Sequence, residues 1–235
     1  MNYQCLSIAS LALVSTALAQ PVCVSPNVSI PDDIATGVQI PIVVDVPSGA
    51  LLEAITIDLD IEHLWVGDLF VSLAAPDGTA VVLLDRPGIP SSGFPGPFGC
   101  GGADVLATFD DAGLVPAESV CSLTGVPVIT GAVSPFGSLS VLVGTEVSGT
   151  WTLNVSDRSS FDVGVVRSVC LDITASEPCP ADLAEPFGTL NFFDVSAYLT
   201  SYVAEDPAAD LAAPFGALNF FDVTAYIAQF NAGCP

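Results

Sequence analysis

Residues 55–62 read ITIDLDIE, and in this stretch aliphatic side chains alternate with polar or acidic ones. Successive side chains of a β-strand point to opposite faces, so the alternation predicts a strand with one buried face and one wet, acidic face. The same alternation recurs at 69–73 and 165–173, and PDG at 76–78 is typical of a tight turn. Residues 30–175 are therefore expected to form an antiparallel β-sandwich or barrel.

The C-terminal part of the chain contains an internal repeat. Residues 182–198 read DLAEPFGTLNFFDVSAY, and residues 210–226 read DLAAPFGALNFFDVTAY. Each copy is typical of a loop followed by a short helix with an Asn N-cap and an Asp three residues further on. We therefore expect a mostly β protein in which a small α-helical module of two repeats, 179–235, follows a short linker at 176–178.

The charge of the chain excludes several classes of function. There are 26 acidic residues and three basic ones, the latter all arginines, so the formal net charge is -23. Without lysine there is neither a P-loop lysine nor a Schiff-base lysine, and without a basic face nucleic acid is excluded as a partner. His63 is the only histidine, and neither a nucleophile elbow nor a zinc motif accompanies it. We expect a structural His63 and no enzymatic activity.

The first 19 residues predict export. They are apolar and uncharged and end in Ala-Leu-Ala, as a secretory signal does, and no later apolar run reaches the length of a membrane span. In an exported chain the six later cysteines predict three disulfides, for which 15 pairings are open. Proximity in the sequence favours two pairs and leaves a third: Cys100–Cys121, Cys179–Cys234 and Cys23–Cys170.

Five segments within 30–175 follow one another in a characteristic order: IEHLWVGDL (61–69), APDGT (75–79), FDDA (109–112), GTWTLNVSD (149–157) and DVG (162–164). They resemble the P/Homo B domain that follows the catalytic domain of kexin- and furin-like proprotein convertases. The family usually has a threonine where Leu64 follows His63. The resemblance implies a jelly-roll-like β-sandwich that stabilises a protease and carries no catalytic residues.

The two repeats, together with the ending NAGCP at 231–235, are similar to dockerin-type modules of the GC variety found in some bacteria. That resemblance implies EF-hand-like calcium loops and a protein partner, with the exported protein secreted or held at a bacterial cell surface. The chain departs from the pattern in two ways. The spacing from Asp182 to Asp194 is one residue longer than in an EF-hand loop, and the middle ligands are replaced by residues such as Ala184 and Pro186.

Aspartates and phenylalanines of these motifs are the candidate site residues. Five aspartates could meet at one calcium ion, the alternative being separate surface turns: Asp68, Asp110, Asp111, Asp157 and Asp162. Four more are weaker calcium ligands, the alternative being loop and helix capping without an ion: Asp182, Asp194, Asp210 and Asp222. Adjacent helical residues point about 100° apart, so we expect Phe193 and Phe221 to be at least partly exposed for a partner, and Phe192 and Phe220 to be buried.

These observations favour an exported, non-catalytic binding or anchoring protein whose sandwich is tethered through its dockerin-like tail. One alternative is an accessory domain that stabilises a subtilisin-like serine endopeptidase. Another is a carbohydrate-binding sandwich, which would need a row of exposed aromatic side chains.

Overall fold

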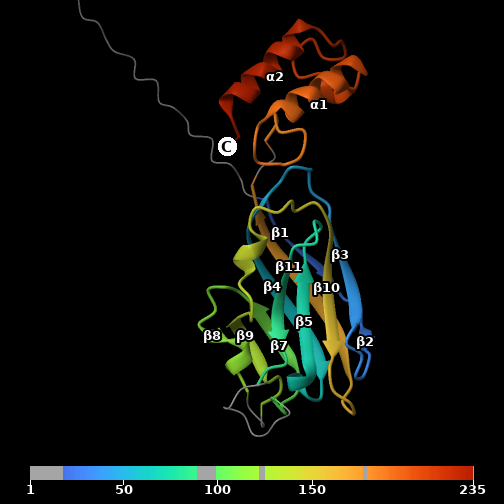
Figure 1. Ribbon diagram of the computed structural model, residues 1–235, viewed down its shortest axis with the longest axis vertical. Helices are drawn as coiled ribbons and strands as arrows, with labels where there is room; N and C mark the ends of the chain where they lie inside the picture. The colour runs from blue at the N-terminus through green and yellow to red at the C-terminus, as the bar shows by residue number, and fades with distance from the viewer. Residues whose placement is uncertain (1–17, 89–98, 122–124, 177–178, 235) are drawn as a thin grey trace, which may run out of the picture.

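The computed structural model describes residues 18–88, 99–121, 125–176 and 179–234, and within these ranges the protein is mostly β (Figure 1). The expected secretory signal lies outside the described residues, except for Leu18 and Ala19 at the start of the first strand. The strands, in chain order, are β1 (Leu18–Val24), β2 (Val28–Ile30), β3 (Val38–Val44), β4 (Leu52–His63), β5 (Leu69–Ala74), β6 (Ala80–Asp85), β7 (Val105–Phe109), β8 (Val115–Pro116), β9 (Ile129–Ser134), β10 (Gly149–Asp157) and β11 (Gly164–Ala175). No helix among the described residues is long and apolar enough to cross a membrane.

The strands form two sheets, as the sequence predicted. The larger sheet has the order β1-β11-β4-β7-β9-β8, with β2 also paired to β11, and the smaller one has the order β3-β10-β5-β6. Most pairs are antiparallel, but β9 runs parallel to both β7 and β8, which the expectation of an antiparallel sandwich did not include. The chain returns to the starting end of β7 before it enters β9, and the Cys100–Cys121 disulfide ties together the segments that lead into these strands.

Alternating side chains of the two sheets build the core. Ile57, Leu59 and Ile61 of β4 are buried, whereas Asp58 and Glu62, on the other face of the strand, are exposed to solvent. Trp151 of β10 is fully buried, and its indole N–H donates to the carbonyl oxygen of Val147 at 3.0 Å. The polar end of this ring is therefore paired within the core, as a buried tryptophan requires.

Three disulfides join the pairs that sequence proximity favoured. Cys23–Cys170 links directly opposite residues of β1 and β11, and Cys100–Cys121 links two connections of the sandwich. Cys179–Cys234 closes the helical module near its two ends. A module of about this size has too small a core to rely on burial alone, so the last bridge supplies stability that the core lacks.

The helical module contains α1 (Phe192–Val203) and α2 (Phe220–Ala232), which lie beyond one end of the sandwich in Figure 1. Its own small core includes Tyr198 and Tyr226, one from each helix. The expectation that Phe192 and Phe220 are buried is wrong, because these side chains are 76% and 73% exposed. The residues that each helix buries are instead an aspartate and a tyrosine. With that face of the helix turned inward, the phenylalanines lie in solvent.

Candidate functional site

A buried histidine and aspartate organise the end of the sandwich that is remote from the helical module. His63 is the last residue of β4 and Asp157 the last of β10, and both are fully buried. His63 Nε2 and Asp157 Oδ2 are hydrogen-bonded at 3.2 Å, and Asp157 Oδ1 accepts the N–H of Ser159 at 3.0 Å. The pair joins one strand of each sheet and fixes the turn after β10, which supports the structural interpretation of His63.

His63 also positions the backbone of Trp65. With its proton on Nε2, the ring accepts the N–H of Trp65 at Nδ1, at 3.2 Å; Nδ1 also lies 2.9 Å from the Trp65 carbonyl oxygen. The close approach of Gly164 over this ring leaves no room for a side chain, since a Cβ there would lie 2.4 Å from the imidazole carbon. The first residue of β11 must therefore be glycine for His63 to keep its place.

Asp68 lies beside this pair in the short 3-10 helix η1 (Val66–Asp68) and is only 3% exposed. Burial and the nearby carboxylate of Asp157 raise the pKa of Asp68 to about 6, and the charges of Arg86 and His63 only partly oppose this. Arg86 Nη2 lies 3.7 Å from Asp68 Oδ1, which is an ion pair but longer than a hydrogen bond. The site therefore holds more negative charge than its neighbours balance.

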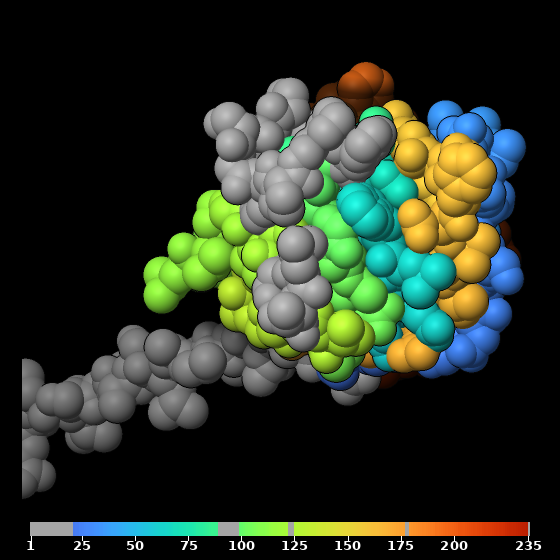
Figure 2. All heavy atoms as spheres, turned by 90° about the horizontal axis from the view of Figure 1, so that it is seen from below, coloured from blue at the N-terminus to red at the C-terminus, as the bar shows by residue number. Residues whose placement is uncertain are grey.

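A hollow of about 360 Å³ opens above Asp68. It lies between the segment that leads into β5 and the connection from β10 to β11, and these two segments lie side by side in Figure 2, cyan and gold. Its walls combine two aromatic rings, two carboxylates and two hydroxyls: Trp65, Phe161, Asp68, Asp162, Ser159 and Ser160.

The structure separates the five aspartates that were expected to share a calcium ion. Asp68, Asp157 and Asp162 gather near His63, but Asp110 follows Phe109, which pairs with Ile57 of β4. Along the strand this places Asp110 and Asp111 about 20 Å from the His63 end. The expectation of one shared site is therefore wrong for this pair.

Asp111 has a different structural task. Its carboxylate accepts the backbone N–H groups of Leu139 and Ser140 and the hydroxyl of Ser138, at 2.8, 3.1 and 2.7 Å. It thereby holds the start of the 3-10 helix η3 (Leu139–Leu142). Asp110 in turn accepts the N–H of Ala112, as aspartates in turns commonly do.

The described residues of the sandwich do not fit a calcium ion. Calcium takes six to eight oxygen ligands, whereas both oxygens of Asp157 are already bound to N–H donors and Arg86 already faces Asp68. Within the described ranges, no group of three or more His, Cys, Asp or Glu side chains is placed to hold a metal ion.

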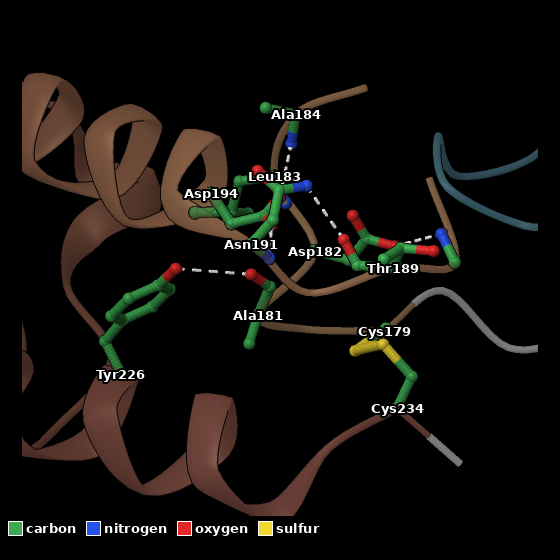
Figure 3. The surroundings of a disulfide bond; sticks show 11 residues. Cys179, Ala181, Asp182, Leu183, Ala184, Thr189, Asn191, Asp194, Tyr226 and Cys234 are labelled. Carbon is green, nitrogen blue, oxygen red and sulfur yellow. Dashed lines mark hydrogen bonds between the residues drawn. A yellow bond between two sulfur atoms is a disulfide. The ribbon is translucent and has the colours of Figure 1, made fainter. Parts of the chain in front are cut away.

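The aspartates of the repeats close their loops with backbone hydrogen bonds, which Figure 3 shows for the first repeat. Asp194 Oδ1 accepts the N–H groups of Leu183 and Ala184, both at 2.9 Å, and Oδ2 accepts the N–H of Asn191 at 2.7 Å. Burial disfavours the charge of Asp194, but these donors outweigh it and hold its pKa below the usual range. Asp222 makes the same three bonds in the second repeat.

Asp182 and Asp210 lie at the first position of each loop, and the two carboxylate oxygens of each differ in their hydrogen bonding. One oxygen accepts the N–H of Gly188 or Gly216, while Oδ1 of each is buried without a hydrogen-bond partner. Burial and the facing carboxylate of Asp194 raise the pKa of Asp182. Where a calcium loop needs further oxygens, these loops present backbone N–H groups to the last aspartate, so the residues do not fit a calcium site.

The helices present a repeated aromatic surface. Phe193 and Phe221 are 61% and 62% exposed, as the sequence predicted for them, and their neighbours Phe192 and Phe220 are exposed as well. Leu199 and Ile227 are about half exposed on the same helices. We call these six side chains the repeat surface.

Sequence reasoning missed the aromatic walls of the pocket, Trp65 and Phe161, and the ion-pair partner of Asp68, Arg86. Arg86 and Phe161 both have positive φ, 54° and 94°, which a sequence pattern does not reveal in residues other than glycine. Trp65 stood inside a quoted motif, but its place in the wall depends on the fit of its ring over Gly101. A Cβ on Gly101 would lie 2.7 Å from that ring.

Comparisons with known proteins find partial matches to two larger proteins. The chain is 32% identical over 126 residues to the calcium-dependent protease of Trichormus variabilis, which covers 52% of this chain and 14% of that protein. It is 29% identical over 143 residues to leupeptin-inactivating enzyme 1 of Streptomyces exfoliatus, covering 60% of this chain and 23% of that one. The chain thus spans less than a quarter of the length of these relatives.

The solved structures that match this chain include the serine protease of Aeromonas sobria, with 16% identity and a TM-score of 0.39 over 75% of this chain and 28% of that chain. The segment of this chain that matches a family model runs from residue 52 to residue 94, from β4 through β6, and includes His63, Trp65 and Asp68. Residues 52–94 match the proprotein convertase P-domain.

Proposed function

We propose that the chain is an exported, non-catalytic binding protein, in which a protease-associated P-domain-like sandwich at 30–175 is carried by a partner-binding module at 179–235. The observation that carries the proposal is the repeat surface. Two helices expose the same pair of phenylalanines, and both pairs are more than half accessible. Each pair places two large apolar side chains next to each other in solvent, and exposed apolar groups of this kind are typical of interaction sites.

The design of the module favours binding over mere folding. Each helix uses its inward face for an aspartate and a tyrosine, so the fold does not need the phenylalanines for its core. A second copy keeps the Phe-Phe pair at the same place on its helix. Aromatic side chains at the centre of an interface commonly carry most of its binding energy.

The match of residues 52–94 supports a role beside a protease for the sandwich. A calcium-dependent protease and a leupeptin-inactivating enzyme are among the proteins that the chain resembles, and the disulfides fit an extracellular location. We therefore place the protein outside the cell and propose a proteolytic enzyme as one class of partner. Stabilisation of a subtilisin-like serine endopeptidase by the sandwich is the second candidate function, supported by the same match.

A carbohydrate-binding sandwich has less support. The exposed aromatic side chains in the described part of the sandwich are Phe136 and Phe161. They belong to two different connections, between β9 and η3 and between β10 and β11, and so do not line one face of a sheet.

Capture from the surface fraction of the source organism tests the partner proposal. The full mature chain is compared with the double variant Phe193→Ser/Phe221→Ser and with the control Phe136→Ser, which removes an equally exposed phenylalanine from the sandwich. We expect one protein, identified by mass spectrometry, to bind the parent chain and the control but not the double variant. Equal binding to all three chains would contradict the proposal.

A further inference from the structure

The hollow above Asp68 has the chemistry of a site for an organic cation. Two aromatic rings, those of Trp65 and Phe161, line it together with the carboxylates of Asp68 and Asp162. An aromatic face attracts a cation electrostatically, and a carboxylate pairs with it directly. At about 360 Å³ the hollow is near the lower end of small-ligand pockets, which suits one side chain better than a large molecule.

Asp68 lines this hollow and keeps unused hydrogen-bonding capacity. Its side chain is more than nine-tenths buried, yet among the described residues no hydrogen-bond donor reaches its carboxylate, and the Arg86 guanidinium stays 3.7 Å away. A buried carboxylate gains most from a donor that arrives with a positive charge. Asp157 and Asp162 add negative charge around it, so one arginine does not balance the site.

The walls fit a guanidinium better than a metal ion. A metal would need several oxygens in a shell, whereas two of the six lining residues are aromatic and Asp157 is already held by His63 and Ser159. The same end of the molecule already stacks one guanidinium on a ring, since Arg158 lies 4.1 Å from the ring centre of Phe70.

The rim of the hollow is held ready for contact. Phe161 is 92% exposed at φ 94°, and its N–H donates to Asp32 Oδ1 at 3.1 Å, which ties the tip of the connection to the segment after β2. A bulky residue with positive φ costs conformational energy, and here that cost keeps an aromatic ring in solvent at the pocket.

We propose that this hollow binds the guanidinium group of an arginine side chain presented by a protein partner, with Asp68 and Asp162 as its ionic contacts and Trp65 and Phe161 as its aromatic walls. The site shares no residue with the repeat surface. The two proposals can therefore be tested, and contradicted, separately. The net charge of -23 attracts cationic partners over a distance and adds to their rate of encounter.

The indole N–H resonances of the nitrogen-15-labelled full mature chain give a direct test, because the chain has two tryptophans. Trp65 lines the hollow, while Trp151 is fully buried and serves as an internal reference. Titration with Nα-acetyl-arginine amide at constant ionic strength is expected to shift the Trp65 signal to saturation and leave that of Trp151 in place. The neutral analogue Nα-acetyl-citrulline amide is expected to shift neither.

Matched variants separate a specific site from general attraction to an acidic protein. Asp162→Asn is expected to weaken arginine binding about threefold to tenfold, and Phe161→Leu by a similar factor, whereas Asp172→Asn, which removes one exposed charge from the large sheet, changes it less than about twofold. Equal effects of Asp162→Asn and Asp172→Asn would overturn the proposal. So would an equal response to citrulline, or displacement of arginine by calcium chloride at the same ionic strength.

Discussion

Tyr198 and Tyr226 stack face to face, with their ring centres 4.0 Å apart and their planes 3° from parallel. They occupy the same position in the two repeats, so the core of the helical module is built around a contact between equivalent residues. Their hydroxyls differ, however. Tyr226 donates to the carbonyl oxygen of Ala181 at 3.3 Å, while the buried hydroxyl of Tyr198 has no partner in the described part of the chain.

This difference predicts unequal effects of the same substitution. Tyr226→Phe removes a hydrogen bond and leaves the Ala181 carbonyl without its donor, so it should lower the free energy of unfolding of the module by about 1 kcal/mol. Tyr198→Phe removes only an unsatisfied hydroxyl and should be neutral or slightly stabilising. Calorimetric melting of the two variants of the mature chain checks this, and a larger loss for Tyr198→Phe would contradict the structure of the core.

The two aspartates of the first loop should also respond in opposite ways. Asp194→Asn replaces an acceptor of three backbone N–H groups by a side chain that itself carries donors, and we expect a loss of about 3 kcal/mol at pH 7. Asp182→Asn neutralises a carboxylate whose pKa burial has raised, so at pH 7 it should cost little or stabilise the module. Chemical denaturation of both variants measures the contrast, and equal losses would refute the assigned roles.

The pKa of Asp68, about 6, predicts how the sandwich responds to pH. Since the folded state binds this proton more tightly than the unfolded chain, where the pKa is 3.8, the ionised carboxylate destabilises the fold above pH 6 and the penalty disappears as the pH falls toward 4. Asp68→Asn should therefore stabilise the sandwich at pH 7.5 by about 1 kcal/mol, a value reduced from the linkage limit because solvent reaches the pocket.

The pH series supplies its own control for this prediction. At pH 3.5 the parent carboxyl is mostly protonated in both states, so Asp68→Asn and the parent should melt at nearly the same temperature. A stabilisation that does not change between pH 7.5 and pH 3.5 would show that the gain does not come from the charge of Asp68.

Calcium should stabilise the protein no more than sodium does. Within the ranges that the structure describes, no group of three or more His, Cys, Asp or Glu side chains is placed to hold an ion, whereas an acidic chain gains from any screening salt. Melting in calcium chloride and in sodium chloride of equal ionic strength should therefore give equal temperatures for the mature chain. A reproducible extra shift in calcium would show that one set of aspartates is a calcium site after all.

Most of the fold could be predicted from two features of the sequence, the alternating pattern at 55–62 and the repeat at 182–226. Alternation reflects which side chains face water and which face the core. It therefore predicts that a segment is a strand, whatever the position of that strand in the sheet. The capping boxes at Asn191 and Asn219 were also predictable, because the cap residues interact with their own helix. Local interactions of this kind can be predicted because they involve residues that are close together in the sequence.

The parts that could not be predicted depend on contacts between distant segments. The orientation of Phe192 follows from the bonds of Asp194 to a loop ten residues earlier, which rotate the helix about its axis. The separation of Asp110 from Asp68 follows from the register of β7 on β4. The order of motifs along the chain predicts neither the rotation of a helix nor the register of two strands. Asp110 was therefore expected beside Asp68, although the sheet holds them apart.

The repeat surface carries the account of function, and its most direct test is the affinity of the captured partner. Titration calorimetry compares the mature parent chain with Phe193→Ser/Phe221→Ser and with Phe136→Ser. We predict that the double variant binds at least about 100-fold more weakly, because truncation of two interface aromatics commonly costs 2 kcal/mol or more for each, and that Phe136→Ser binds like the parent. An unchanged dissociation constant for the double variant would contradict the claim that the module binds its partner through this surface.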